Sequence, residues 1–320
     1  MLAALGSGIT RGKWYSLIDK IYRPATLQAA WQQVRHRFHP ADICGQAVAA
    51  FEQDAETCLA ELEDALRKGN YQPQSADTSA IAMVKDRIAQ TALKMVVEPI
   101  FEAMFLQPSY GFRPKRGAGD AVRDASRLFR QGRTQVVDID LNCRLADLAH
   151  ERIIACVRER ISDRHVLALV EGWLRQGIMT ELAGMSATGE LKGAVLSPLL
   201  ANLILHPLDA RLAARGYRMV RYAGRMVVLC ATAQDAQAAS REVHAWADEI
   251  GLTLGADNVR VRDCTSMGEG LVFLGHRLEA ESMTLPAIRE LQHLQSSIGC
   301  VERVWPPGTV TAGKGVTLHS

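Results

Sequence analysis

The stretch that most constrains the fold runs from Arg218 to Cys230 and reads RMVRYAGRMVVLC. Two apolar runs, at 219–220 and 226–229, flank a short turn made of Ala223, Gly224 and Arg225. Apolar and β-branched residues on both sides of a glycine-containing turn are typical of a β-hairpin. The sequence therefore predicts two antiparallel strands, near 218–223 and 226–231.

A third strand is predicted at 135–140, which reads QVVDID. Val136, Val137 and Ile139 are typical of a buried strand, and Asp140 ends it with a carboxylate. Apolar residues at helical spacing predict amphipathic helices at 13–34, broken at Pro24, and at 52–68, 84–102 and 233–254. The expected fold class is α+β, with an antiparallel sheet backed by helices and a helical N-terminal extension.

Arginines recur along the segment that precedes the third strand, at spacings of seven, four and three residues: Arg116, Arg123, Arg127 and Arg130. On a helix these spacings place the guanidinium groups on one side, opposite Val122, Ala125 and Phe129. We call these four residues the arginine stripe. Two interpretations remain open, a solvated helix face or a stripe that contacts the phosphates of RNA.

Charge and cysteine content set limits on the function and on the compartment. A net charge of +2 and a pI near 8.2 are too mild to indicate nucleic-acid binding, so any basic surface must be local. The seven cysteines are scattered without a CxxC pair, which favours reduced thiols in a cytoplasm. We expect no membrane association, since no run approaches the roughly 18 apolar residues of a membrane span and the N-terminus has no signal-peptide pattern.

Several motifs occur in an order that resembles bacterial group II intron reverse transcriptases: YQPQ at 71–74, SYGFRP at 109–114, SPLLAN at 197–202, RYA at 221–223 and FLGH at 273–276. The resemblance covers about residues 12–280. It implies a right-hand-like fold with four parts. These are a helical N-terminal extension (1–70), shortened fingers (71–134), a palm (135–280), and a thumb remnant with a Pro/Gly-rich tail (281–320).

The motif on the hairpin departs from the family pattern at the positions that carry its chemistry. The family has Arg-Tyr-Ala-Asp-Asp, and here Gly224 and Arg225 stand where it has the two aspartates. Asp140 matches an aspartate that binds both magnesium ions in the family. The resemblance thus implies a vestigial site formed by Asp140, Tyr222, Ala223, Gly224 and Arg225.

Other departures fall on positions that face the nucleotide pocket in the family. No Lys or Arg lies between Asn70 and Lys85, where the family has a basic fingers hairpin. Leu191 and Lys192 replace a Pro-Gln pair, and a late lysine is absent from 255–259. With one of three carboxylates left, we expect no bound metal, no cofactor and no polymerase activity.

The leading hypothesis is a catalytically inactive protein that binds structured RNA or an RNA/DNA hybrid, or that serves as an assembly component with a protein partner or as a homo-oligomer. The residues expected to contact nucleic acid are Arg113, Lys115, Arg116, Arg123, Arg127, Arg130, Lys192 and Arg225. Two alternatives stay open. One is a polymerase or nucleotidyl transferase that uses a partner subunit or relocated carboxylates, such as Asp138 or Asp147. The other is a purely structural subunit.

Overall fold

The computed structural model describes residues 12–37, 43–73, 79–141, 145–179, 195–265, 271–278 and 283–284. The helices of the N-terminal half are α2 (Ile18–Ile21), α3 (Pro24–Arg37), α4 (Ile43–Glu52), α5 (Ala55–Lys68), α6 (Ala80–Glu102) and α7 (Ala118–Arg130). After them come β1 (Gln135–Asp140), the 3₁₀ turn η1 (Leu145–Asp147), α8 (His150–Arg158), α9 (Arg164–Arg175), α10 (Ser197–Ala214), β2 (Arg218–Tyr222), β3 (Arg225–Cys230), α11 (Ala233–Ile250), β4 (Val259–Asp263), β5 (Leu271–Phe273), β6 (His276–Leu278) and β7 (Met283–Thr284).

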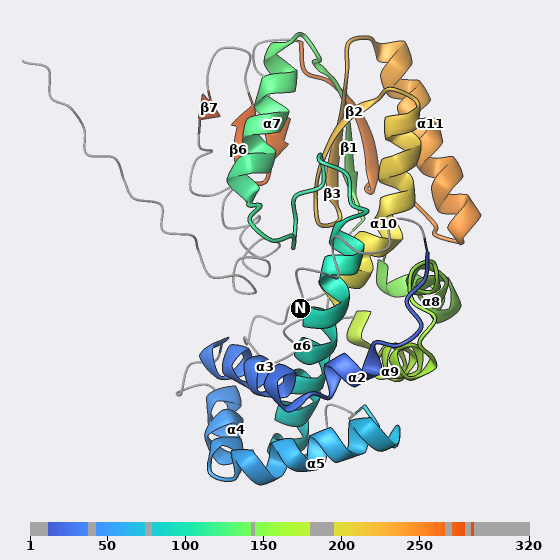
Figure 1. Ribbon diagram of the computed structural model, residues 1–320. Helices are drawn as coiled ribbons and strands as arrows, with labels where there is room; N and C mark the ends of the chain where they lie inside the picture. The colour runs from blue at the N-terminus through green and yellow to red at the C-terminus, as the bar shows by residue number, and fades with distance from the viewer. Residues whose placement is uncertain are drawn as a thin grey trace, which may run out of the picture.

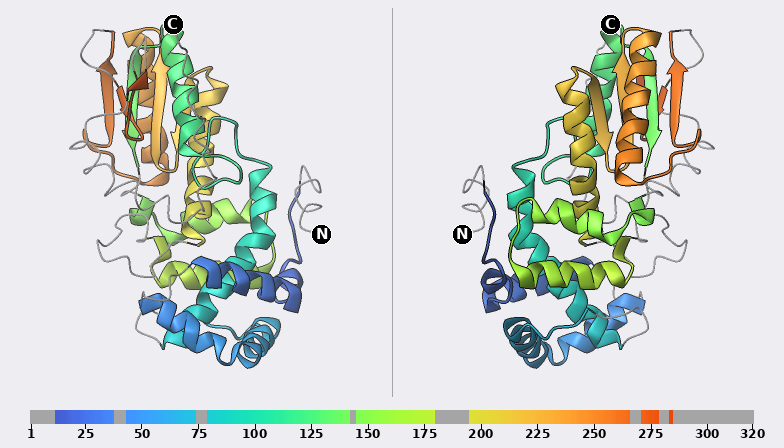
Figure 2. Two further views of the ribbon diagram at one scale, coloured as in Figure 1. Left: turned by 90° about the vertical axis from the view of Figure 1, so that its left-hand side faces the viewer. Right: turned by 90° about the vertical axis from the view of Figure 1, so that its right-hand side faces the viewer.

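The long helix α6 connects the two ends of the molecule. Its first turn is capped by the Ser79 hydroxyl, which accepts a hydrogen bond from the Ala82 amide at 3.3 Å. α3, α4 and α5 pack against α6 at the end away from the sheet, as Figures 1 and 2 show. The expected helical N-terminal extension is therefore confirmed, and the predicted break falls at Pro24, the first residue of α3.

One carboxylate fastens the N-terminal helices to the rest of the chain. Asp163 accepts hydrogen bonds from the amides of Leu17 and Ile18, at 2.7 and 2.9 Å, and from those of His165 and Val166. It therefore caps the starts of α2 and α9 together. Burial acts to raise the pKa of Asp163, but these four donors outweigh it and lower the pKa below its ordinary value.

The main sheet is antiparallel and its strands lie in the order β2-β3-β1-β4. The three predicted strands are confirmed to within one residue at each end. The predicted turn is corrected, however, because Arg225 is the first residue of β3 and pairs with Tyr222. The turn consists of Ala223 and Gly224 alone, with Ala223 in the left-handed region at φ +55°.

The two faces of the sheet belong to different cores. Val137 and Ile139 of β1 pack with α10 and α11, whereas Val136 packs with α7 and the β5–β6 hairpin. Figure 1 shows α7 and β6 on one side of the sheet and α10 and α11 on the other. Because side chains alternate along a strand, Asp138 and Asp140 lie on the face that α7 partly covers.

The architecture confirms the expected α+β class, with an antiparallel sheet backed by helices. The division into four parts stays a prediction. Of the expected thumb remnant and tail at 281–320, only residues 283–284 belong to the described part of the chain.

Candidate functional site

The candidate site begins where β1 and β3 end side by side. Asp140 lies directly opposite Arg225 in the β1–β3 register, and the amide of Leu141 donates to the carbonyl of Gly224 at 2.9 Å. The Asn258 side chain donates to the Asp140 carbonyl at 3.2 Å, and the Asp140 amide donates to the Asn258 carbonyl at 2.8 Å. The backbone on both sides therefore fixes the position from which the Asp140 carboxylate projects.

The guanidinium of Arg225 lies between two carboxylates. Its Nη1 donates to Oδ2 of Asp140 at 2.8 Å, and its Nη2 lies 3.7 Å from Oδ1 of Asp138. On the other side of Asp138, Arg262 of β4 approaches to 3.5 Å. These side chains form an Arg–Asp–Arg–Asp ladder across three strands, which we call the charge ladder. Arg225 is the first residue of β3 and lies opposite Asp140 in the register, so its side chain projects from the same sheet face as the Asp140 carboxylate.

The donor set does not fit the pair of magnesium ions that the family resemblance implies. Magnesium requires near-octahedral oxygen coordination, with carboxylates free to contact the ion. Gly224 offers no side chain, and Asp138 and Asp140 both contact arginines in the charge ladder. Among the described residues, no three His, Cys, Asp or Glu side chains are grouped so that they could hold a metal.

Arg221, the first residue of the quoted hairpin motif, is fully buried and paired. It forms a bidentate ion pair with Asp209 of α10, whose side chain is also 0% exposed, at 2.6–3.1 Å. Its Nη1 also donates to Oδ1 of Asn202 at 2.7 Å. Asn202 and Asp209 are two helical turns apart, so they present one polar face of α10 to the hairpin.

A loop between α6 and α7 completes this arrangement. The Tyr110 amide donates to the Arg221 carbonyl and the Arg221 amide donates to Pro108, both at 2.8 Å. Asn202 Nδ2 donates to the Gly111 carbonyl at 2.9 Å. A Cβ at Gly111 would lie 2.2 Å from the backbone nitrogen of Ala223, so only glycine fits there. The segments SYGFRP, SPLLAN and RYA therefore meet in one structural junction.

The expectation that Arg113 contacts nucleic acid is corrected by its position. The residue is 4% exposed, and its Nε and Nη2 donate to the carboxylate of Glu102 at 2.7–3.0 Å. Its Nη1 donates to the carbonyls of Leu106 and Ser109 at 2.6 and 2.7 Å. Arg113 organises the loop from inside, and its guanidinium is not exposed to a phosphate.

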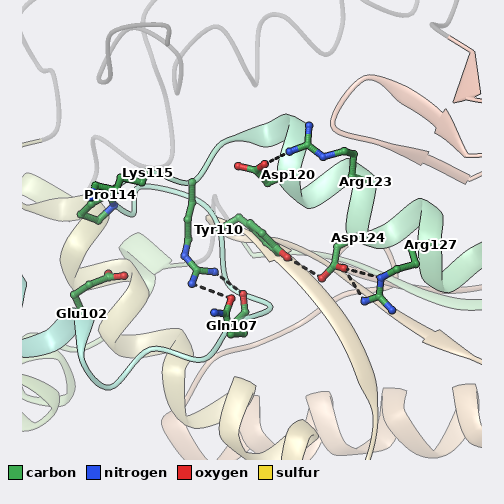
Figure 3. Close-up of a pocket in the computed structure, with 10 residues that line it drawn as sticks. Glu102, Gln107, Tyr110, Pro114, Lys115, Asp120, Arg123, Asp124 and Arg127 are labelled. Carbon is green, nitrogen blue, oxygen red and sulfur yellow. Dashed lines mark hydrogen bonds and ion pairs between the residues drawn. The ribbon is translucent and has the colours of Figure 1, made fainter. Parts of the chain in front are cut away.

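Lys115 and Arg116 lie at an open pocket of about 610 Å³ beside the N-terminal half of α7 (Figure 3). Lys115 is exposed and makes no ion pair within the described residues. Arg116 donates to the backbone and side-chain oxygens of Gln107 at 2.7 and 2.9 Å, and its guanidinium lies 5.6 Å from the ring centre of Tyr110. The loop thus presents two cations at the pocket rim.

Three residues of the arginine stripe, Arg123, Arg127 and Arg130, lie on an exposed face of α7, and Val122, Ala125 and Phe129 are buried on the other, as predicted. The fourth, Arg116, precedes the helix and lies in the loop between α6 and α7. Arg123 is 71% exposed and is paired with Asp120; Arg127 is 56% exposed and donates to Asp124 at 2.7 Å. Figure 3 shows both pairs at the pocket wall. The carboxylates three residues earlier reduce the local positive charge, a feature that the sequence-based interpretation did not weigh.

Tyr110 joins α7 to the loop. Its hydroxyl donates to Oδ2 of Asp124 at 2.7 Å. Burial, the hydrogen bond to Asp124 and the charge of that carboxylate raise the pKa of Tyr110 to about 12. Burial acts to raise the pKa of Asp124, but hydrogen bonds from Tyr110 and Arg127 lower it below its ordinary value. Tyr110 therefore remains a hydrogen-bond donor at neutral pH.

Of the other expected contacts, Arg130 is exposed on α7 and its Nε approaches the Ser126 carbonyl at 3.4 Å. Lys192 lies outside the described residues. Tyr222 packs partly against the core under α7 and Ala223 is buried, so both act as structural residues here.

Within the described residues, no helix is both long enough and apolar enough to span a membrane.

Two arginines that were not expected at a site, Arg133 and Arg218, line a second pocket. It adjoins the first, since Asp124 and Arg127 line both. Arg133 follows α7 and Arg218 begins β2, so they are 85 residues apart in sequence. No spacing rule links them, and only the tertiary fold brings them together.

Comparison with known proteins shows a match of residues 55–277 to the family described as reverse transcriptase (RNA-dependent DNA polymerase). Protein YkfC of Escherichia coli is 34% identical over 165 residues, which cover 46% of this chain and 43% of that protein. The group II intron-encoded protein LtrA of Lactococcus lactis is 28% identical over 169 residues, covering 48% and 28%. This chain therefore spans less than half the length of either relative.

Among solved structures, a chain of a partial Cas6-RT-Cas1–Cas2 complex aligns with 73% of this chain and 42% of its own length. The sequence identity is 20% and the TM-score is 0.39.

Proposed function

The chain belongs to the reverse transcriptase (RNA-dependent DNA polymerase) family, in its group II intron-encoded branch, and on that premise we propose that it is a catalytically inactive member that binds structured RNA. The observation that carries the proposal is the guanidinium of Arg225, held between the carboxylates of Asp140 and Asp138. A cation of the protein itself stands beside the one carboxylate that matches the family's metal ligands.

The positive charge of Arg225 opposes the binding of a divalent ion at Asp140. Metal-dependent nucleotide transfer relies on divalent ions that neutralise the triphosphate and activate the attacking hydroxyl. The ion pair with Arg225 offsets the negative charge of Asp140 that would attract such an ion. The guanidinium also places a positive charge that repels the ion beside the site. Loss of the ions is expected to slow synthesis at least about a thousandfold. The sequence between Asn70 and Lys85 also lacks the cations expected to hold phosphates.

RNA binding is supported by the surface beside α7. An open pocket beside the loop and helix is lined by Lys115, Arg116, Arg123 and Arg127, and Arg130 is exposed further along α7. The carboxylates paired with Arg123 and Arg127 leave these arginines able to bind phosphate, since an exposed ion pair contributes only about 0–1 kcal/mol and exchanges readily for a phosphate contact. The group II intron-encoded relative LtrA supports an RNA context for this proposal. A role in a mobile element and a role in the host are both compatible with it.

The polymerase alternative with relocated carboxylates has one supporting observation. Asp138 shares its strand face with Asp140, as a substitute metal ligand would have to. Both carboxylates, however, contact arginines. DNA synthesis by the purified protein distinguishes this alternative from the proposal.

Binding is tested by fluorescence anisotropy with a structured RNA in EDTA, over about 50–200 mM salt. The proposal predicts metal-independent binding whose log K falls linearly with log salt, by about 0.7–0.9 per neutralised phosphate. Replacing Arg123, Arg127 and Arg130 by Gln should weaken it. Binding that is absent at about 100 mM salt would contradict the proposal and favour a purely structural subunit.

A further inference from the structure

The second pocket adjoins the surface assigned to RNA and shares Asp124 and Arg127 with it. It has a volume of about 540 Å³ and is bounded by the C-terminal end of α7, the start of β2 and the end of α10. Its floor includes the apolar side chains of Leu128 and Met219, and its rim includes Gln131 and Tyr217. It opens beside the edge of the sheet formed by β2, away from the charge ladder.

Two cations line this pocket without a carboxylate partner. Arg133 is partly exposed and Arg218 is exposed, and neither forms an ion pair or a side-chain hydrogen bond with any described residue. In this respect they differ from Arg123 and Arg127, whose charges are paired on the same helix. Two unpaired guanidinium groups in one concavity raise the local positive potential.

Among the described residues that line the pocket, the one carboxylate, Asp124, already has hydrogen-bond partners. Asp124 accepts from Tyr110 on one side and from Arg127 on the other. Its Oδ2 and Oδ1 are therefore engaged at the wall that separates the two pockets. Arg127 contributes a third guanidinium to this wall, so the excess charge of the pocket is positive.

We propose that Arg133 and Arg218 together bind a phosphate group in this pocket. The guanidinium fork is suited to phosphate because two parallel N–H groups match two phosphate oxygens. A phosphate there would neutralise a pair of charges that no described carboxylate pairs with. The group comes from one of two sources, a phosphodiester of a bound RNA that continues from the first pocket, or a free phosphate or nucleotide.

The inference goes beyond the proposed function because neither arginine belongs to the surface assigned to RNA, and it requires no RNA to be true. The test compares two double variants. One carries Arg133→Gln and Arg218→Gln, and the other, the control, carries Arg164→Gln and Arg241→Gln. The control removes two exposed arginines, on α9 and α11, that also form no ion pair with a described residue. Both variants lose the same charge, so general electrostatics cancel.

Titration calorimetry with inorganic phosphate and with adenosine monophosphate tests the free ligand, and anisotropy with a single-stranded RNA tests the backbone. At least one probe should bind at least about tenfold more weakly to the Arg133/Arg218 variant than to the control, because each lost charged contact is equivalent to roughly tenfold. A change with the small anions identifies a free-phosphate site, and a change confined to RNA identifies a backbone site. In the RNA case the salt slope should fall by about two contact equivalents.

Equal binding of every probe by the two double variants, or no binding by the unmodified protein, overturns the inference. The outcome is separable from the proposed function. RNA binding that responds to the α7 arginines but not to Arg133 and Arg218 leaves the proposed function standing and removes this pocket from it. Circular dichroism and urea unfolding confirm that both variants remain folded, as expected for side chains without partners.

Discussion

The buried ion pair beneath the hairpin makes the most quantitative prediction. Arg221 and Asp209 are both 0% exposed, and the guanidinium also donates to Asn202 and to the Ala223 carbonyl. Arg221→Met removes the cation and leaves the Asp209 carboxylate in the core without its partner. Breaking a buried pair in this way destabilises a protein by about 3–5 kcal/mol. That is a large share of the roughly 5–15 kcal/mol typical of a folded domain.

Urea unfolding followed by circular dichroism measures the loss as a lower midpoint. The matched control is Arg260→Met, because Arg260 lies 2.8 Å from Asp257 but the two side chains are 50% and 94% exposed. An exposed pair of this kind contributes at most about 1 kcal/mol. The comparison isolates burial, since the substitution is the same and both native pairs have short contacts.

A second variant separates the two contributions. Adding Asp209→Leu to Arg221→Met replaces the whole pair by apolar side chains, which should recover part of the lost stability. A loss of 1 kcal/mol or less for Arg221→Met, equal to that of the Arg260 control, would refute the reasoning. The hairpin would then be held by its backbone and apolar contacts alone.

Three further predictions concern the exposed arginines of α7, the capping residue Asp163 and the close approach at Gly111. Replacing the three exposed arginines of α7 by Gln should flatten the salt dependence of RNA affinity by two to three contact equivalents, with little change in the urea midpoint; an unchanged slope would reduce the arginine stripe to a solvated face. Because the folded pKa of Asp163 is lowered, its contribution to stability is complete above the ordinary value of 3.8 and is lost as the pH falls through the folded pKa. Urea unfolding from pH 7 to pH 3 should therefore show a steeper loss for the unmodified protein than for Asp163→Asn, and parallel curves would contradict it. Gly111→Ala should destabilise by about 1–3 kcal/mol, since its Cβ would lie 2.2 Å from Ala223, and an unchanged urea midpoint would show that the loop shifts at no cost.

The distribution of apolar and charged residues along the sequence predicted the strands of the main sheet and the exposed face of α7. The apolar runs in 135–140 and 218–230 predicted three strands, because one sheet face packs on α10 and α11 and the other on α7, so that both faces need apolar residues. The spacing of the α7 arginines likewise predicted an exposed face. These features follow from periodicity, which a sequence carries directly.

The surroundings of individual side chains depend on residues from other elements, and the sequence did not predict them. Arg113 was expected at the surface, but Glu102, eleven residues earlier, and nearby carbonyls enclose it. Arg225 was placed in the turn, whereas the two-residue turn brings it into β3, opposite Asp140. A one-residue change in register moves a side chain to the other face of a sheet, so such pairs follow only from the folded chain.

The most direct test of the central claim is DNA synthesis on a primed RNA template, in Mg²⁺ and separately in Mn²⁺. The purified protein is measured beside Asp140→Ala, which removes the retained carboxylate. Because Arg225 holds that carboxylate at 2.8 Å, both proteins should give the same background signal in either metal. Extension by the unmodified protein that disappears in Asp140→Ala would contradict the account and establish an active metal site.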